Sequence, residues 1–217
     1  MTTSTPLPEL RHLDWDDPTR ARKAAESAFT RLTDDRWALL LELLDALPDH
    51  PELTEMCETY DFLDKLVLHN DADGGFRVRL HVFRPGYFDR PHNHRWPFAS
   101  MILTGSYLHT LYGADTDFET ATLASLRPLH VHTESAGGWY LLHHSAVHSV
   151  AAEAGTVSLI LRGPAAKDAF RIIDVPTGES FHVRGAKDES LQQRADKRTD
   201  PARLTQTIDR VRALRPA

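Results

Sequence analysis

The sequence lacks several features that would place the protein in other classes. It has a single cysteine, Cys57, in 217 residues, so no internal disulfide framework is expected and a reducing cytoplasm is the expected location. It contains no run of about 18 apolar residues, and its first residues are polar, so neither a membrane span nor a secretory signal is expected. The formal net charge is −6. Nucleic acid is therefore not an expected partner, because no basic excess exists to neutralise phosphates.

The first sixty residues have the pattern of helices. Asp17 followed by Pro18 predicts a helix start, because Asp caps a helix and Pro is favoured at its first position. Thr33 or Asp34 can cap a second helix that Pro48 ends, and four of its residues are expected to be buried by their helical spacing: Trp37, Leu40, Leu41 and Leu44. Residues 51–63 predict a third, short helix. It contains Cys57, which we interpret as a buried or half-buried structural residue and not as a reactive thiol.

From residue 62 onward, short strands with turn signals between them replace the helices. A hairpin is predicted around residues 71–75, and further strands are predicted over 98–103, 106–113, 120–134, 138–144, 146–153, 156–164 and 169–176. A series of strands without intervening helices is typical of a barrel or sandwich. The sequence therefore predicts a mainly β barrel at 62–183, a helical extension at 1–61 packed on its outer face, and a helical tail at 184–217.

The stretch from Gly86 to Gly105 contains two closely spaced histidines. His92 and His94 are separated by one residue, and an apolar run starting at Phe98 follows them. On a strand, residues two apart point to the same face, so both imidazoles are expected to project into one space. The same alternation would bring Trp96, Phe98 and Ser100 to that face. The pattern predicts a pair of metal ligands on a strand that enters the core.

A third imidazole is available downstream, after the apolar run at residues 139–142. His148 is the preferred third ligand, and His143 and His144 are alternatives with a less suitable spacing. His130 and His132 alternate on another expected strand, where they would lie at the surface or orient a ligand from outside. Three imidazoles with open coordination positions suit zinc, iron, copper or nickel. Because imidazole is neutral, such a metal keeps its charge and favours an anionic ligand.

These two stretches resemble the cupin superfamily. Its first motif, G(X)5HXH(X)3-4E(X)6G, matches Gly86, His92, His94 and Gly105, with Phe98 in the glutamate position. Its second motif, G(X)5PXG(X)2H, matches in spacing at four positions, with the proline and the glycine replaced: Gly137, His143, Ser145 and His148. The resemblance implies a double-stranded β-helix, or jelly-roll, barrel.

Over residues 60–175 the chain is similar to the thiol dioxygenases, the cysteine dioxygenase group. This resemblance implies Fe(II) held by His92, His94 and His148, with O2 as a substrate. The family has Ser, His and Tyr at alternate positions of one strand, and the matching residues here are Ser158, Ile160 and Arg162. The position of the family's carboxylate-binding arginine falls at Leu66, beside Lys65. We therefore carry over the metal ligands and not the thiol substrate.

The strand at residues 76–83 has one apolar face and one face that carries Arg77, Arg79, His81 and Phe83. The resemblance implies that His81 and Phe83 line the pocket while the apolar face packs under the helices. The other interpretation leaves Arg77 and Arg79 in solvent. Arg162 is expected to face the metal cavity, as are Ser158 and Ile160, which alternate with it on one strand. It is expected to bind an anionic substrate, or else to reach the rim and pair with Asp168 or Asp174.

The sequence thus predicts a metal-dependent enzyme, with a non-haem iron oxygenase acting on a small anionic molecule as the first hypothesis. Zinc or another divalent transition metal in a non-oxidative enzyme is the second hypothesis, and a non-catalytic cupin that binds a small ligand is the third. A homodimer is left open. The expected substrate-binding residues are Arg79, His81, Phe83, Trp96, Phe98, Ser158 and Arg162.

Overall fold

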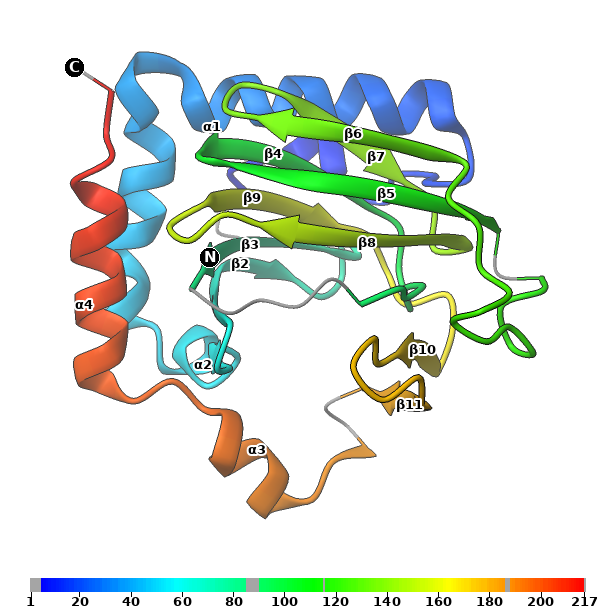
Figure 1. The fold of residues 1–217 in the computed structure, drawn as a ribbon. Coiled ribbons are helices and arrows are strands. Elements are labelled where there is room, and N and C mark those ends of the chain that lie inside the picture. Colours follow the sequence, from blue (N-terminus) through cyan, green and yellow to red (C-terminus); the bar gives the residue numbers. More distant parts are fainter. Residues whose placement is uncertain (1–4, 85–89, 115, 186–187, 217) are drawn as a thin grey trace.

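Two antiparallel sheets form the body of the computed structural model, which describes residues 5–84, 90–114, 116–185 and 188–216 (Figure 1). The larger sheet has the strand order β1-β2-β3-β9-β4-β7 and the smaller one the order β6-β5-β8, while β10 and β11 form a separate hairpin. The strands are β1 (Glu58–Thr59), β2 (Leu63–Asp71), β3 (Phe76–Phe83), β4 (Phe98–Thr104), β5 (Ser106–Ala114), β6 (His130–Ser135), β7 (Trp139–Leu142), β8 (Ala146–Ala152), β9 (Val157–Arg162), β10 (Ala169–Ile173) and β11 (Ser180–Arg184). The predicted fold class, mainly β with helices at both ends, is confirmed.

The helices are η1 (Pro8–Leu10), α1 (Pro18–Ala46), η2 (Leu47–Asp49), α2 (Pro51–Thr54), α3 (Leu191–Lys197) and α4 (Pro201–Arg212). Helices α1 and α4 pack on one side of the larger sheet, whereas α3 lies apart from them (Figure 1). The predicted cap of α1 is confirmed, since the Asp17 carboxylate accepts hydrogen bonds from the backbone N–H groups of Thr19 and Arg20. The predicted break is also present: α1 bends at residues 34–37, where Asp34 is extended and the next three residues have positive φ. The second half of α1 runs beside α4 (Figure 1).

The largest hydrophobic core lies outside the barrel, between the helices and the outer face of the larger sheet. Helix residues such as Phe29, Leu40 and Leu44 pack there with sheet residues such as Leu80 and Leu159. The predicted outward face of β3 is therefore confirmed. Three of the four helix residues predicted to be buried are so, but Leu41 is only partly buried. The arrangement leaves the barrel interior free for other side chains.

Two predicted elements are shorter than expected. The helix predicted over 51–63 ends at Thr54, because the chain turns to form β1, whose residues pair with Asp64 and Lys65 of β2. The strand predicted over 120–134 begins only at His130, because Thr122 and Ser125 hydrogen-bond to one another in a turn. Cys57 follows α2 and is buried, with its sulfur accepting from the backbone N–H of Val67.

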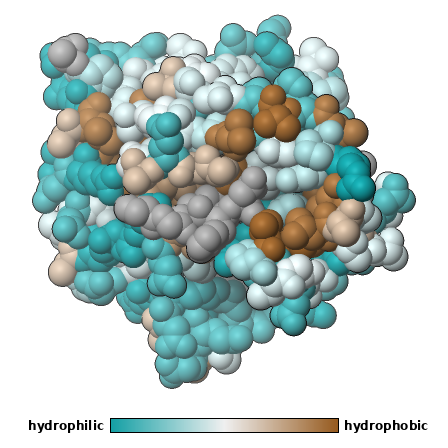
Figure 2. Space-filling model, viewed as in Figure 1, coloured by the Kyte–Doolittle hydropathy of each residue, from teal (hydrophilic) through white to brown (hydrophobic). Residues whose placement is uncertain are grey.

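None of the helices in the described part of the chain combines the length and the apolarity that a membrane crossing requires. On the surface, a group of apolar side chains lies over β5 and β6, in the upper part of Figure 2. Leu108, Leu129 and Val131 are 44%, 72% and 48% exposed there. β6 has a neighbour on one side only, so this patch borders a sheet edge.

Candidate metal site

The two histidines of the HXH segment do not lie on a regular strand, contrary to the prediction. The segment is a short bridge between β8 and β10, in which the backbone of His92 exchanges both hydrogen bonds with that of His148. On the other side, the N–H of Ile173 donates to the carbonyl of Pro91. Pro91 and Pro97, which lack N–H donors, flank the segment and limit its pairing. Gly86, the first glycine of the predicted motif, lies outside the described residues.

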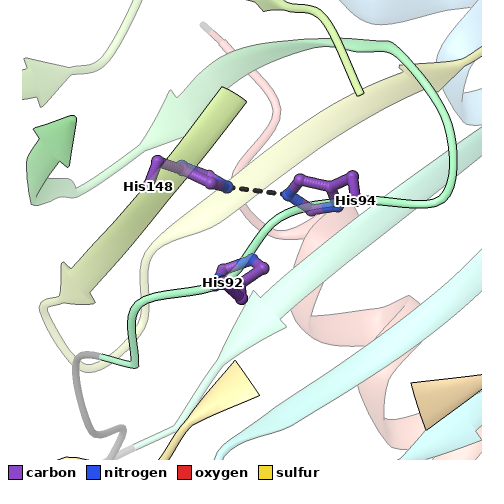
Figure 3. Close-up of side chains that lie close together, drawn as sticks. All are labelled: His92, His94 and His148. Atoms are coloured by element: carbon purple, nitrogen blue, oxygen red, sulfur yellow. Dashed lines mark hydrogen bonds between the residues drawn. The ribbon is translucent and has the colours of Figure 1, made fainter. Parts of the chain in front are cut away.

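The three predicted ligands nevertheless converge. His92 and His94 come from the bridging segment and His148 from β8, and their rings point toward one another (Figure 3). The Nε2 atoms of His94 and His148 are 2.7 Å apart, and the three histidines can each offer a nitrogen within 4.8 Å of the others. Because a single backbone bridge joins His92 to His148, the register itself brings the ligands together.

The imidazoles of this cluster are held neutral. Burial lowers the pKa of His92 below its ordinary value of 6.5, and it lowers the pKa values of His94 and His148 much further, with the neighbouring histidines adding to the effect. The Nδ1 of His92 is 2.7 Å from the carbonyl of Arg90, so it carries the proton and leaves Nε2 with a lone pair. Neutral imidazoles with free lone pairs are the form that binds a divalent metal.

A series of hydrogen-bonded side chains extends outward from His148. Its Nδ1 is 2.9 Å from the Nε2 of His109, whose Nδ1 is 3.3 Å from the carboxylate of Glu134. Glu134 also accepts from the Nε2 of His132, at 2.7 Å. A carboxylate only accepts, so His109 must donate to Glu134 through Nδ1 and accept from the Nδ1–H of His148. This series of hydrogen bonds therefore fixes the tautomer of His148 in which the Nε2 carries no proton and its lone pair faces His94.

The other histidines considered in the sequence analysis lie in different places. His132 lies behind the site, as one interpretation expected, whereas His130 is exposed. His143 is exposed and pairs with Asp16, and His144 accepts from Lys167 through its carbonyl, so neither joins the cluster. Sequence reasoning missed His109 and Glu134. The alternation of polar residues in β5 and β6 could have indicated these two residues. Only the cross-strand pairing of His109 with His132, however, shows that His109 and Glu134 meet.

The histidine cluster opens on a cavity of about 320 Å³ inside the barrel. Six of the seven predicted substrate-binding residues line it: Arg79, His81, Phe83, Trp96, Phe98 and Ser158. Ser100 and Ile160 also line it, as their strand parity predicted. Among the described residues that form the wall, none is acidic, while Lys65, Arg79 and Arg90 are basic. The cavity therefore favours an anionic occupant.

Arg162 differs from the prediction, because it is not among the residues that line the cavity. Its guanidinium carbon lies 5.4 Å from the ring centroid of Trp96, and that of Arg79 lies 5.6 Å from the same ring. Burial, followed by the positive charges of Arg79, Arg77 and Arg95, lowers the pKa of Arg162 to about 8. Asp174, one of its expected rim partners, pairs with Arg90 instead. Arg162 can thus act on the cavity through Trp96.

Lys65 is the main site residue that the sequence did not single out. In the register of β2 and β3 it lies opposite His81, and its side chain lines the cavity, whereas Leu66 packs under the helices. Its ammonium group is 3.2 Å from the carboxylate of Glu58. Burial opposes the ionisation of Glu58, but Lys65 and Arg79 hold its pKa at about 2. The carboxylate of Glu58 thus offsets part of the positive charge from behind the cavity wall.

Hydroxyl groups occupy the wall that the two sheets share. Tyr107 of β5 donates to the hydroxyl of Tyr140 of β7 at 2.7 Å, and the Ser100 hydroxyl lies 3.3 Å from that of Tyr107. The ring of Tyr140 also lies 4.5 Å from that of His109. Since Tyr140 accepts from Tyr107, its own proton is available to another group. Burial raises the pKa of Tyr140 to about 12, so the hydroxyl is protonated.

No protein-family model matches the sequence, and no curated protein matches it. Solved structures that resemble this chain include an RmlC-like cupin from Shewanella frigidimarina, with a TM-score of 0.39 and 16% identity over 52% of this chain and 86% of that chain. Ectoine synthase from P. lautus has a TM-score of 0.41 and 13% identity over 68% of this chain and 95% of that one. KdgF from Halomonas sp. has a TM-score of 0.38 and 14% identity over 49% and 84%. Such low values carry no conclusion about activity, substrate or metal, and the thiol dioxygenase resemblance stays a prediction.

Proposed function

We propose that this protein is a metal-dependent enzyme of the cupin type, a non-haem iron oxygenase that acts on a small anionic molecule. One observation carries the proposal: three neutral imidazoles, of which His148 is buried and the other two are partly buried, meet in a cavity whose described wall contains basic residues and no carboxylate. His92, His94 and His148 would hold the metal, and Fe(II) bound in this way would keep its charge and supply the reactivity toward O2. A cytoplasmic location, which the single cysteine favours, belongs to the same proposal.

In this proposal, the chain's own residues bind and orient the substrate. Arg79 and Lys65 attract its anionic group, and His81 and Ser158, which are cross-strand neighbours, supply further polar contacts. Trp96 and Phe98 contact the ring of His94, with centroids 4.9 and 4.5 Å away, and keep water from that side of the site. Phe83 closes the wall beside Tyr107, and Arg162 holds Trp96 in place from outside the cavity.

The experiment that tests the proposal is metal analysis of protein purified without added metal. It is followed by O2-consumption assays after iron is restored, with small thiols, amino acids and phenols as substrates. Replacing any of the three ligands, as in His148→Ala, is expected to remove most of the bound metal while the far-ultraviolet circular dichroism stays native, because the main core lies elsewhere. His130→Ala, at an exposed histidine, is the matched control. Normal metal content in His148→Ala would remove that residue from the site.

A second candidate is a zinc enzyme that catalyses a non-oxidative step. The observation that favours it is the protonated hydroxyl of Tyr140 in the cavity, which can deliver a proton to a substrate without any oxidant. Zinc is bound readily by three histidines with one open position. Zinc as the dominant metal, activity without O2 and loss of that activity in Tyr140→Phe would favour this candidate over the first.

A homodimer is a further part of the proposal. Apolar side chains exposed next to a sheet edge, as at Leu108 and Val131, are typical of contact surfaces between proteins. Sedimentation of the protein as a concentration-independent monomer would refute this part and leave the proposed activity untouched.

A further inference from the structure

Two parts of the cavity wall, a cationic part and an apolar part on a hairpin, come from different elements. The basic residues stand on or near β2 and β3, whereas the apolar residues come from several strands and include one face of the β10–β11 hairpin. The hairpin contributes four residues to the wall: Phe170, Ile172, Phe181 and Val183. The register pairs Phe170 with Val183 and Ile172 with Phe181, so these four side chains share one face of the hairpin.

The opposite face of the hairpin is anchored to the rest of the protein. Arg171 is buried, and its guanidinium donates to the carbonyls of Phe118 and Ala121 and to the hydroxyl of Ser180. Its backbone N–H donates to the side-chain oxygen of Asn93, which stands between two of the metal-site histidines. The hairpin is therefore held in register with the histidine cluster. Its apolar face is presented to the cavity, although Phe181 is 44% exposed to solvent.

The cationic part contains polar atoms that lack partners. Among the described residues, neither the Nε of Arg79 nor the Nε2 of His81 has a hydrogen-bond partner, although both atoms are buried. Leaving such groups unpaired is costly, so a ligand that satisfies them gains affinity. Glu58 also acts electrostatically on Arg79, but its salt bridge is with Lys65, and Arg90 pairs with Asp174. In the part of the chain that the structure describes, no carboxylate forms a salt bridge with Arg79. Arg79 is thus the cation best placed to bind one anionic group of a ligand.

Ring contacts link the two parts through the histidine cluster. Trp96 contacts both the Arg79 guanidinium and the ring of His94. On the other side, the ring of Phe170 is nearly parallel to that of His94, at an interplanar angle of 13° and a centroid distance of 6.4 Å. A ligand with its anionic group at Arg79 and His81 and its apolar part on the hairpin would therefore pass beside the histidine cluster.

We infer that the substrate class is a monocarboxylate bearing an aromatic group, with the carboxylate on Arg79 and His81 and the ring on the β10–β11 hairpin. This inference rests on the proposed function, because it concerns the same cavity. An aromatic ring suits the hairpin face, since Phe170 and Phe181 offer ring surfaces for edge-to-face or offset packing. A short aliphatic acid would leave that face uncovered.

The test is equilibrium binding of three matched series to the purified protein under anaerobic conditions, so that no turnover is needed. The first series is benzoate, phenylacetate and 3-phenylpropionate; the second is acetate and propionate; the third is the alcohols that correspond to the aromatic acids. The intrinsic fluorescence of Trp96, measured against a Trp96→Phe control, and calorimetry report binding. At least one aromatic acid is expected to bind 10-fold or more tightly than both the aliphatic acids and its own alcohol.

Two variants separate the two parts of the wall. Phe181→Ala is expected to weaken the best aromatic acid about 5-fold or more and to leave the aliphatic acids unchanged, with Leu129→Ala, at another exposed apolar residue, as the matched control. Arg79→Lys is expected to weaken the acids and not the alcohols, because lysine cannot form the planar bidentate contact. Equal binding of aromatic and aliphatic acids, or unchanged binding in Phe181→Ala, would overturn the inference. Selective binding of an aromatic acid by a protein that consumes no O2 with iron would uphold it and refute the oxygenase.

Discussion

Glu134 offers the sharpest test of how the site is built, because it contacts no proposed metal ligand and acts only through His109. The substitution Glu134→Gln keeps the size of the side chain and replaces one acceptor oxygen by an NH2 donor. Glutamine can direct this donor at His109, which then protonates on Nε2 and donates to His148. His148 would carry its proton on the nitrogen that faces the cavity, and that nitrogen could no longer bind a metal.

The expected loss of metal affinity follows from the change in the contact between Glu134 and His109. Substitution of an outer partner of a metal-binding histidine typically lowers metal affinity 10–100-fold, or by about 1.4–2.8 kcal/mol. Burial lowers the pKa of His109 to about 4 even though Glu134 raises it, so His109 is neutral at pH 7 and its tautomer, not its charge, is at stake. We therefore expect the lower metal affinity in Glu134→Gln at every pH where the protein stays folded.

The assay is competition for Zn²⁺ or Co²⁺ with a chromophoric chelator, together with nitrogen-15 NMR of the imidazoles to identify the tautomer of His148. His132→Ala is the matched comparison, because it removes the other partner of Glu134 and leaves the contact with His109 intact. Glu153→Gln, at an exposed position directly after β8, controls for the change in charge. If Glu134→Gln binds metal as tightly as the two comparison variants do, the tautomer argument is wrong.

Three further predictions concern stability and reactivity. Burial keeps the pKa values of His94 and His148 far below 6.5 in the folded protein, so the unfolded chain binds more protons at these residues. The unfolding free energy of the metal-free protein should therefore fall below about pH 6.5, by up to about 1.4 kcal/mol per pH unit for each group. A denaturation midpoint that stays constant from pH 7 to 5 would contradict this. Leu40→Ala should cost about 2–5 kcal/mol of unfolding free energy and Leu41→Ala clearly less, since Leu40 is buried and Leu41 is not fully so; equal losses in urea denaturation would speak against the packing described. Burial raises the pKa of Cys57 to about 11, so its thiol should react with a thiol reagent such as DTNB only after denaturation, and rapid labelling of the native protein would show that this residue is accessible.

Patterns that depend on neighbours in the sequence were predictable. Asp17 and Pro18 predicted the start of α1. The alternation of apolar and polar residues in β3 predicted one face under the helices and one face on the cavity. The convergence of His92, His94 and His148 was also predictable, but its cause was not. The expected strand is a bridge between β8 and β10, and the pairing of His92 with His148 cannot be deduced from spacing.

Features that depend on register between distant strands could not be predicted. Lys65 lies in the cavity because β2 pairs with β3 so that it stands opposite His81, and a bulge follows between Val67 and His69. Glu134 reaches His109 only because β6 pairs with β5 at one particular register. The alternation along β9 predicted Arg162 in the cavity, yet this residue, at the end of β9, contacts the ring of Trp96 and is not among the residues that line the cavity.

The location of the main core outside the barrel has a consequence for how such a chain can change over evolutionary time. Selection for folding acts mostly on the interface between the helices and the larger sheet, whereas selection for chemistry acts on the inward faces of the strands. The two sets of positions alternate along the same strands and overlap little. Substitutions on the cavity side can therefore accumulate with a small loss of folding free energy, so the same framework can be adapted to a new substrate without first acquiring compensating stability.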